Sequence, residues 1–132
     1  MSFFSQLIDN IATAAENTEP YANIVYGSDP PNDGICMIPS SVGPIDTHLN
    51  KGMIYDLPVV LNGKNADQQL LLDDLTRIHA AITRRTSYTD LSTVSCQVVD
   101  ISTTALPSII GREQNNQWVC GSSFNVKFYW RK

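Results

Sequence analysis

The chain has 132 residues, of which 42% are hydrophobic and 17% are charged, and its net charge is −4 at pH 7. The length predicts a single domain spanning residues 1–132, and the composition is neither that of a disordered chain nor that of a membrane protein. The acidic balance argues against general binding to nucleic acid or to anionic membranes. We therefore expect a soluble domain whose partners are proteins.

The N-terminal segment, residues 1–19, predicts an amphipathic helix. Its polar residues lie between apolar residues that recur at helical spacing. The apolar set is Phe4, Leu7, Ile8, Ile11, Ala14 and Ala15. Pro20 is expected to end the helix. The segment lacks the basic start of a secretory signal peptide, so synthesis in a cytoplasm is expected.

The next part of the chain predicts two strands. Residues 35–39 form a short apolar run after the turn-rich sequence YGSDPPNDG, and residues 40–52 are expected to form a loop. Residues 53–61 alternate between apolar and mixed positions, which is typical of a strand with one buried face. Pro58 has no N–H group, so this strand is expected to lie at a sheet edge or to carry a bulge there.

The stretch NGKNADQQLLLDDLTRIHAAITRR, residues 62–85, predicts the main helix. Asn65 and Gln68 match a capping box, and Arg84 and Arg85 are expected to close the last turn. Four apolar side chains share one face, which we expect to pack on the core. This stripe consists of Leu71, Leu75, Ile78 and Ile82.

The ionisable residues of this helix are poorly spaced for catalysis. Asp73 and Arg77 are four residues apart and are expected to pair on the solvated face. His79 borders the apolar stripe with no carboxylate on its side of the helix, which favours a boundary histidine over a catalytic one. A small enzyme that uses His79 with Asp73 and Asp74 stays an alternative.

The C-terminal part predicts two further strands. Residues 94–101 form the first, and residues 102–116 are expected to form a loop. Residues 117–130 alternate along their whole length, which is typical of a long strand. Its predicted core face is Trp118, Cys120, Ser122, Phe124, Val126, Phe128 and Trp130. Because such a strand exceeds the width of a compact domain, we expect a bulge or kink at Gly121 to Ser123.

The order of these elements predicts an α+β fold. We expect a mostly antiparallel sheet with one long helix packed on a face and a separate N-terminal helix, because strands and helices do not alternate regularly. Residues 1–19 supply the N-terminal helix, and residues 53–132 supply the sheet and the long helix.

Motifs for catalysis or for cofactor binding are not found. The sequence NGKNA lacks the first glycine and the Ser or Thr of a phosphate-binding loop, and no CxxC, HExxH or GxSxG occurs. Cys36, Cys96 and Cys120 are expected to be reduced and buried. A zinc site would need these cysteines together with His48 and His79, so core positions are the simpler explanation. We expect no enzymatic activity, no cofactor and no metal.

The chain from Gly52 to the C-terminus resembles a family of phage structural proteins. The sequences MIYDLPVVLNGKNADQQLLLDDLTRIHAAI, VSCQVVDISTTALPSII and NQWVCGSSFNVKFYW are similar in arrangement to the minor capsid or tail-terminator proteins of long-tailed (siphovirus-type) phages and prophages. The resemblance covers about 80 of the 132 residues. It consists of patterns and contains no catalytic motif.

This resemblance implies a structural virion protein that forms a ring, usually hexameric, at the head-proximal end of a tail tube. The ring would terminate tube polymerisation and offer the head a docking surface. The implied partners are other copies of the chain, the tail-tube protein and a head-completion or neck protein, while DNA passes through the lumen without specific binding. The implied location is the tail or neck of the virion, with assembly in the host cytoplasm and no membrane contact. A head–tail connector or neck adaptor is the nearest alternative.

The candidate contacts of such an assembly are apolar residues of the two predicted loops, Arg112 in the second loop, and two residues on the flank of the main helix. Exposed apolar patches commonly mark protein interfaces. The candidates are Val42, Ile45, Leu106, Ile109, Ile110, Arg112, Leu70 and Ala81. The alternative is that the loops fold back on the core. A nucleic-acid-binding module that uses the basic aromatic tail KFYWRK is a more distant alternative.

Overall fold

Two helices and one sheet form an α+β fold, which confirms the predicted fold class. The computed structural model describes residues 3–27, 29–40, 43–47, 52–93 and 95–131. In chain order the elements are α1 (Phe3–Glu16), β1 (Ile24–Tyr26), β2 (Ile35–Pro39), β3 (Gly43–Thr47), β4 (Gly52–Asn65), α2 (Gln68–Thr83), β5 (Cys96–Arg112) and β6 (Trp118–Arg131).

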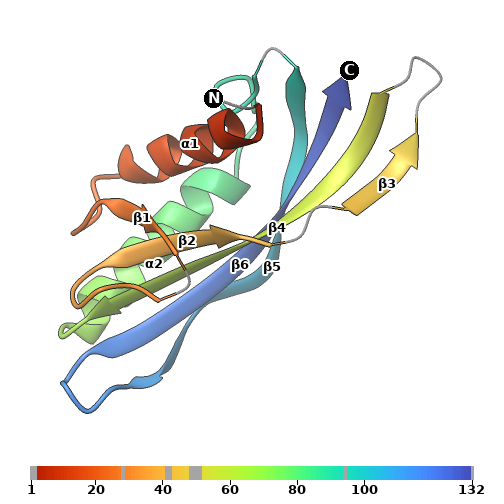
Figure 1. Ribbon diagram of the computed structural model, residues 1–132. Coiled ribbons are helices and arrows are strands. Elements are labelled where there is room, and N and C mark those ends of the chain that lie inside the picture. Colours follow the sequence, from red (N-terminus) through yellow and green to blue (C-terminus); the bar gives the residue numbers. More distant parts are fainter. Residues whose placement is uncertain (1–2, 28, 41–42, 48–51, 94, 132) are drawn as a thin grey trace.

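The central strand of the sheet is β4. The strand order is β1-β2-β4-β6-β5, and β3 pairs with β4 on the same side as β2. The β1–β2 pair is parallel, and the other described pairs are antiparallel. Both helices lie on one face of the sheet, with α2 against β4, β5 and β6, and with α1 beside α2 and β1 (Figure 1). In the described part of the chain, the opposite face of the sheet carries no helix.

The core lies between the helices and this covered face. The predicted stripe of α2 is confirmed, because Leu71, Leu75, Ile78 and Ile82 are all fully buried. The predicted core face of the last strand is also confirmed through its middle. Its buried members are Cys120, Ser122, Phe124, Val126 and Phe128. Trp118 and Trp130, at the two ends of the strand, are partly buried and pack against the core.

The helix α2 begins at a cap that differs from the predicted one. Asp67 is the N-cap, and its Oδ1 accepts hydrogen bonds from the backbone N–H groups of Gln69 and Leu70. Asn65 is still part of β4, and its Oδ1 accepts a hydrogen bond from the N–H of Asp67. The predicted capping box of Asn65 and Gln68 is therefore wrong, because the strand continues to Asn65 before the chain turns.

The prediction that Pro58 marks a sheet edge or a bulge is wrong. Pro58 lies in the middle of β4, opposite Asn125, in an uninterrupted register with β6. On the other side of β4, the Pro58 carbonyl accepts a hydrogen bond from Ser40, at 2.7 Å. The pairing with β2 begins at Val59 and the pairing with β3 ends at Asp56. The missing N–H therefore faces the gap between β2 and β3, where no ladder bond is lost.

Both predicted loops contain strands. Residues 43–47 of the first form β3, and most of the second belongs to β5, which continues to Arg112. The pairing of β5 with β6 has four register shifts, and Pro107 lies within this irregular part. An edge strand tolerates a proline and bulges because one side of its backbone needs no partner strand. The residues that suggested a loop are therefore compatible with an irregular edge strand.

The predicted bulge at Gly121 to Ser123 is also wrong, because the irregularities lie in β5. The register between β4 and β6 runs without a shift through Gly121. A Cβ atom at Gly121 would lie 2.8 Å from Asn62 Oδ1 and 2.8 Å from Ile110 Cδ1. A larger residue there would have to displace the ends of these two side chains, which approach the backbone of β6 closely.

Candidate interaction surface

Most large apolar side chains that stay exposed lie on the two outer strands of the sheet. They are Val25 and Tyr26 in β1, Val99, Leu106 and Ile110 in β5, and Leu70 in α2. The strands β1 and β5 occupy opposite ends of the strand order. The chain therefore has two apolar edges, which are separated by the width of the sheet.

The segment of β5 from Leu106 to Ile110 contains the two most exposed of these residues. Leu106 is 70% exposed and Ile110 is 68% exposed. Ile109 differs from both, because it lies opposite Cys120 and packs partly buried against the core. Of the three candidate contacts predicted in this segment, Leu106 and Ile110 are exposed and Ile109 is not.

Arg112 lies at the end of the same strand. Its guanidinium carbon is 5.4 Å from the centre of the Trp118 ring, and its Nη2 donates a hydrogen bond to Asn116 Oδ1 at 2.6 Å. Cation–π contact and this hydrogen bond hold the exposed side chain against the β5–β6 hairpin. A fixed cation therefore follows the apolar segment of β5.

The other predicted contacts are dispersed. Leu70 is 39% exposed in the first turn of α2. Ala81 is partly buried and lines a pocket at the other end of that helix. Val42 lies outside the described residues, and Ile45 belongs to β3 but its side chain is not described. The two helix residues do not form one surface with β5.

The outer edge of β5 is poorly suited to pairing with another strand. Four register shifts interrupt it, and Pro107 removes one backbone donor. Such features are common on edge strands and hinder a continuous ladder with a second chain. We therefore expect β5 to contact a partner through its side chains, chiefly Leu106 and Ile110.

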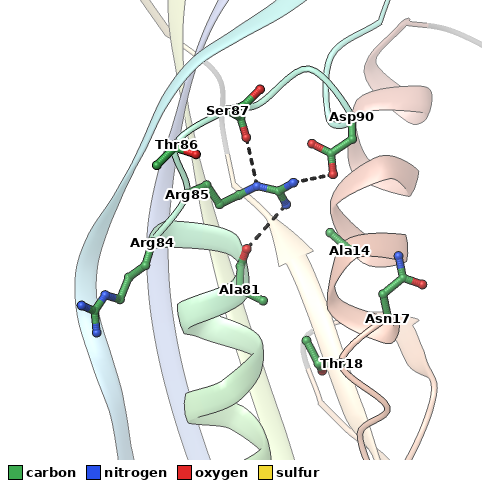
Figure 2. Close-up of a pocket in the computed structure, with 9 residues that line it drawn as sticks. All are labelled: Ala14, Asn17, Thr18, Ala81, Arg84, Arg85, Thr86, Ser87 and Asp90. Atoms are coloured by element: carbon green, nitrogen blue, oxygen red, sulfur yellow. Dashed lines mark hydrogen bonds and ion pairs between the residues drawn. The ribbon is translucent and has the colours of Figure 1, made fainter.

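A pocket of about 580 Å³ lies where the C-terminal ends of α1 and α2 meet (Figure 2). Within it, the Arg85 guanidinium pairs with Asp90 and donates hydrogen bonds to the carbonyl oxygens of Ser87 and Ala81. Arg84 is the C-cap of α2 and points away from the other residues in Figure 2. The two arginines therefore lie just beyond the last helical residue, Thr83, and not within the last turn as predicted, but both close that end of the helix, since the Arg84 N–H donates to Ala80 O and Arg85 donates to Ala81 O.

His79 is more deeply buried than a boundary histidine. It is 3% exposed, and its Nε2 lies 2.8 Å from Thr103 Oγ1. Its ring meets the Phe124 ring edge-on at a centroid distance of 6.0 Å. Nδ1 is buried and has no hydrogen-bond partner among the described residues. Burial lowers the pKa of His79, so the neutral imidazole is favoured in the fold.

Protonation of His79 is expected to destabilise the fold. The pKa of His79 in the folded state lies below the usual value of 6.5. The stability that the neutral ring contributes is therefore complete above pH 6.5, and it is lost as the pH falls through the folded-state pKa. Urea titration should give a smaller free energy of unfolding at about pH 5 than at about pH 7.5. His79→Leu should reduce this difference. An equally large difference in the variant would contradict the assignment.

Asp74 is a buried carboxylate at 4% exposure. Its Oδ2 accepts a hydrogen bond from the N–H of Tyr21 at 2.9 Å, and its Oδ1 accepts one from Arg77 Nη2 at 3.0 Å. Arg77 Nε also donates to the carbonyl oxygen of Thr18, just after α1. Arg77 therefore pairs with Asp74 and not with Asp73 as predicted. These contacts fasten the segment after α1 to α2.

The side chains of the catalytic alternative do not act on one another. Asp73 is exposed and accepts a hydrogen bond from Gln69 Nε2. Asp74 is engaged with the backbone of Tyr21, and His79 is engaged with Thr103. Each of the three groups therefore has its own partner, and they form no catalytic relay.

The cysteines are all buried. Burial raises the pKa of Cys96 to about 12 and that of Cys120 to about 11, so these thiols stay protonated at neutral pH. Cys36 lies in β2 and its pKa is raised for the same main reason. Within the described ranges, no three His, Cys, Asp or Glu side chains are grouped so as to hold a metal ion.

Comparison with models of known protein families found no match, and comparison with curated proteins also found none. A membrane crossing would need a longer and more apolar helix than either helix of the described residues provides. Because neither comparison suggests a function, the functional proposal is based on the exposed apolar residues of the chain.

Proposed function

We propose that this chain is a structural virion protein of the tail-terminator type, which forms a ring on the head-proximal end of a phage tail tube. The observation that best supports the proposal is the pair of apolar edges on one sheet. Large apolar side chains scattered singly are ordinary on a protein surface, but grouped ones commonly mark an interface. Leu106 and Ile110 are both exposed within a short segment of β5, and Val25 and Tyr26 are exposed on the two faces of β1.

A ring of identical subunits needs two different contact surfaces on each subunit. Heterologous contacts generate a closed ring when the rotation between neighbours closes. The outer strands β1 and β5 supply two distinct surfaces at opposite ends of the strand order. The resemblance in arrangement that the sequence from Gly52 onward suggests points to the same assignment. The proposed partners are other copies of the chain, the tail-tube protein and a head-completion or neck protein.

The proposed role is structural and not enzymatic. The buried ionisable side chains His79 and Asp74 both make contacts that hold secondary-structure elements together. The net charge of −4 fits a ring through which DNA passes without being retained.

Replacing both Leu106 and Ile110 with aspartate is expected to abolish ring formation while the monomer stays folded. Both side chains are exposed, so the change leaves no core cavity and places two carboxylates in the proposed contact. Size-exclusion chromatography with light scattering, with and without tail tubes, measures assembly, and circular dichroism measures folding.

Leu70→Asp is the matched control, because Leu70 is also exposed and apolar but lies on α2. Its rings should persist. Rings that persist in the Leu106→Asp, Ile110→Asp variant would refute the proposed use of β5. Loss of rings in Leu70→Asp alone would place the contact on the helix layer.

A further inference from the structure

The sheet face without helices is closed at one end. Cys36 of β2 lies on this face, because its chain neighbours Ile35 and Met37 both belong to the core on the other face. The Cys36 side chain is nevertheless fully buried. Val25, which pairs with Cys36 in β1, is 43% exposed. In the described part of the chain no helix covers this face (Figure 1), so a loop must bury the Cys36 thiol.

Lys64, at the end of β4, lies on the same face and is also buried. A Cβ atom at Gly63 would meet two leucine side chains of α2, so the next side chain in the strand points away from the helices. The Lys64 side chain is 8% exposed, and its Nζ lies 3.0 Å from Asp29 Oδ1 and 3.0 Å from Glu113 Oε2. Asp29 belongs to the connection between β1 and β2, and Glu113 belongs to the β5–β6 turn. One buried cation therefore joins two loops that are far apart in the sequence.

Residues 29–34 of the β1–β2 connection, which we call the strap, are also tied to the β5–β6 turn by hydrogen bonds. The Asp33 N–H donates to Gln117 Oε1 at 2.8 Å, and Gln117 Nε2 donates to Asp33 Oδ1 at 3.2 Å. Asn115 Nδ2 donates to Asn32 Oδ1 at 3.0 Å. The strap therefore spans the end of the sheet from β2 to the β5–β6 turn.

The strap is the loop that buries Cys36. Burial is the main cause that raises the pKa of Cys36, and the charges of Asp29 and Lys64 act on this pKa as well. Both charged groups are therefore close to the thiol. Pro30, the residue after Asp29, is buried although it lies in a loop.

The strap itself has little apolar anchorage. Of its six residues, only Pro30 and Gly34 are buried. The Asp29 side chain is 82% exposed and the Glu113 side chain is 41% exposed, and ion pairs of exposed groups contribute little. Segments with few buried apolar side chains open at a smaller free energy than the whole fold does. Lys64 acts against opening, because a buried ammonium is costly without its carboxylates.

We propose that the strap is a conformational device that opens locally, and that the two ion pairs of Lys64 hold it closed. Opening uncovers the Cys36 thiol and exposes Lys64 to water, while the core between the helices and the other sheet face stays folded. In the closed strap one carboxylate is enough to balance the buried ammonium, so loss of both carboxylates favours the open form most. The strap thus controls access to the helix-free face at this end of the sheet.

Labelling of the native cysteines with N-ethylmaleimide, followed by mass spectrometry of the peptides, measures opening at each thiol. Cys36, Cys96 and Cys120 are all buried, so each reacts from an opened form. Cys36 is expected to react at least about tenfold faster than Cys120, which lies in β6 between two strands, and low urea should change its rate little. Equal rates at Cys36 and Cys120 that rise together with urea would overturn the inference, because Cys36 would then open only by global unfolding.

Asp29→Asn and Glu113→Gln test the role of Lys64. Each change alone should accelerate the labelling of Cys36 by no more than about tenfold, since one carboxylate remains at the ammonium. Both changes together should accelerate it by more than the product of the two single effects, because the closed strap then buries an unpaired cation. In a Lys64→Met background the same two changes should no longer accelerate labelling.

Asp73→Asn is the matched control, because it removes the same charge from an exposed aspartate on α2. It should leave the labelling of Cys36 unchanged. The rates at Cys96 and Cys120 should stay slow in every variant, which shows that the chain is folded. Acceleration of all three cysteines together would show global opening and contradict the strap. Independent effects of the two changes, or equal acceleration without Lys64, would contradict its role.

Discussion

Phe124→Ala is expected to lower the free energy of unfolding by about 3–5 kcal/mol. Phe124 is fully buried in β6, between Val59 of β4 and Thr103 of β5 in the strand register. Its ring also meets the ring of His79 from α2. Truncation would therefore leave a cavity where three strands and the helix meet, and the surrounding elements can close it only in part. Urea titration analysed as a two-state transition measures the loss.

Val99→Ala is the control for this prediction, since Val99 is 47% exposed on β5. A substitution on such a surface position should change the free energy of unfolding by less than about 0.5 kcal/mol. A loss at Phe124 no larger than the loss at Val99 would contradict the placement of Phe124 in the core.

Asp74→Ala is expected to cost about 1.5–3 kcal/mol, the usual value of a hydrogen bond to a charged group. The variant removes the acceptor of the Tyr21 N–H and the partner of Arg77. The Arg77 side chain is 48% exposed, so it can be solvated after the change and adds little to the cost. The main loss is the acceptor for the backbone of the segment after α1. Urea titration and hydrogen exchange at Tyr21 measure the two effects.

Two further variants separate the contributions at this site. Asp74→Asn keeps an oxygen that can accept the hydrogen bond from Tyr21, so it should lose less stability than Asp74→Ala. Asp73→Ala removes an exposed neighbour and should be close to neutral. Equal losses for Asp73→Ala and Asp74→Ala would show that burial of Asp74 does not matter.

The parts of the fold that the sequence predicts correctly are those in which one face of an element is buried. The stripe of α2 and the alternation of β6 both follow from the geometry of a single element against a core, so the period of the sequence is sufficient. Leu71, Ile78 and Phe124 are examples, and all are fully buried. The fold class follows from the order of these elements.

The incorrect predictions concern partners from distant parts of the chain. Pro58 is tolerated in a central strand only because β2 and β3 leave a gap beside it, and no local pattern reveals that gap. Asp74 is buried because Tyr21, 53 residues earlier, supplies a backbone donor. The segment containing Pro107 has the composition of a loop and still forms a strand, because β6 pairs with β5 on both sides of the proline, at Ala105 and at Ser108.

The candidate surface was predicted in part. The apolar residues of the segment that contains Leu106 and Ile110 predict an exposed surface, and both of these side chains are exposed. Ile109 and Ile110 are the same residue type and point to opposite faces as neighbours in a strand, and it is the pairing of Ile109 with Cys120 that shows which of them faces the core. A pocket of about 240 Å³ beside Tyr26 does not follow from the sequence, because α1, β1 and β2 each contribute to its walls.

The most direct test of the proposed ring is negative-stain electron microscopy of the purified chain, alone and mixed with tail tubes. The proposed function predicts closed rings that cap one end of each tube, and tubes that stop growing when the chain is added to polymerising tube protein. Tubes that lengthen unchanged with no ring at either end, or a chain found on heads and not on tubes, would contradict it.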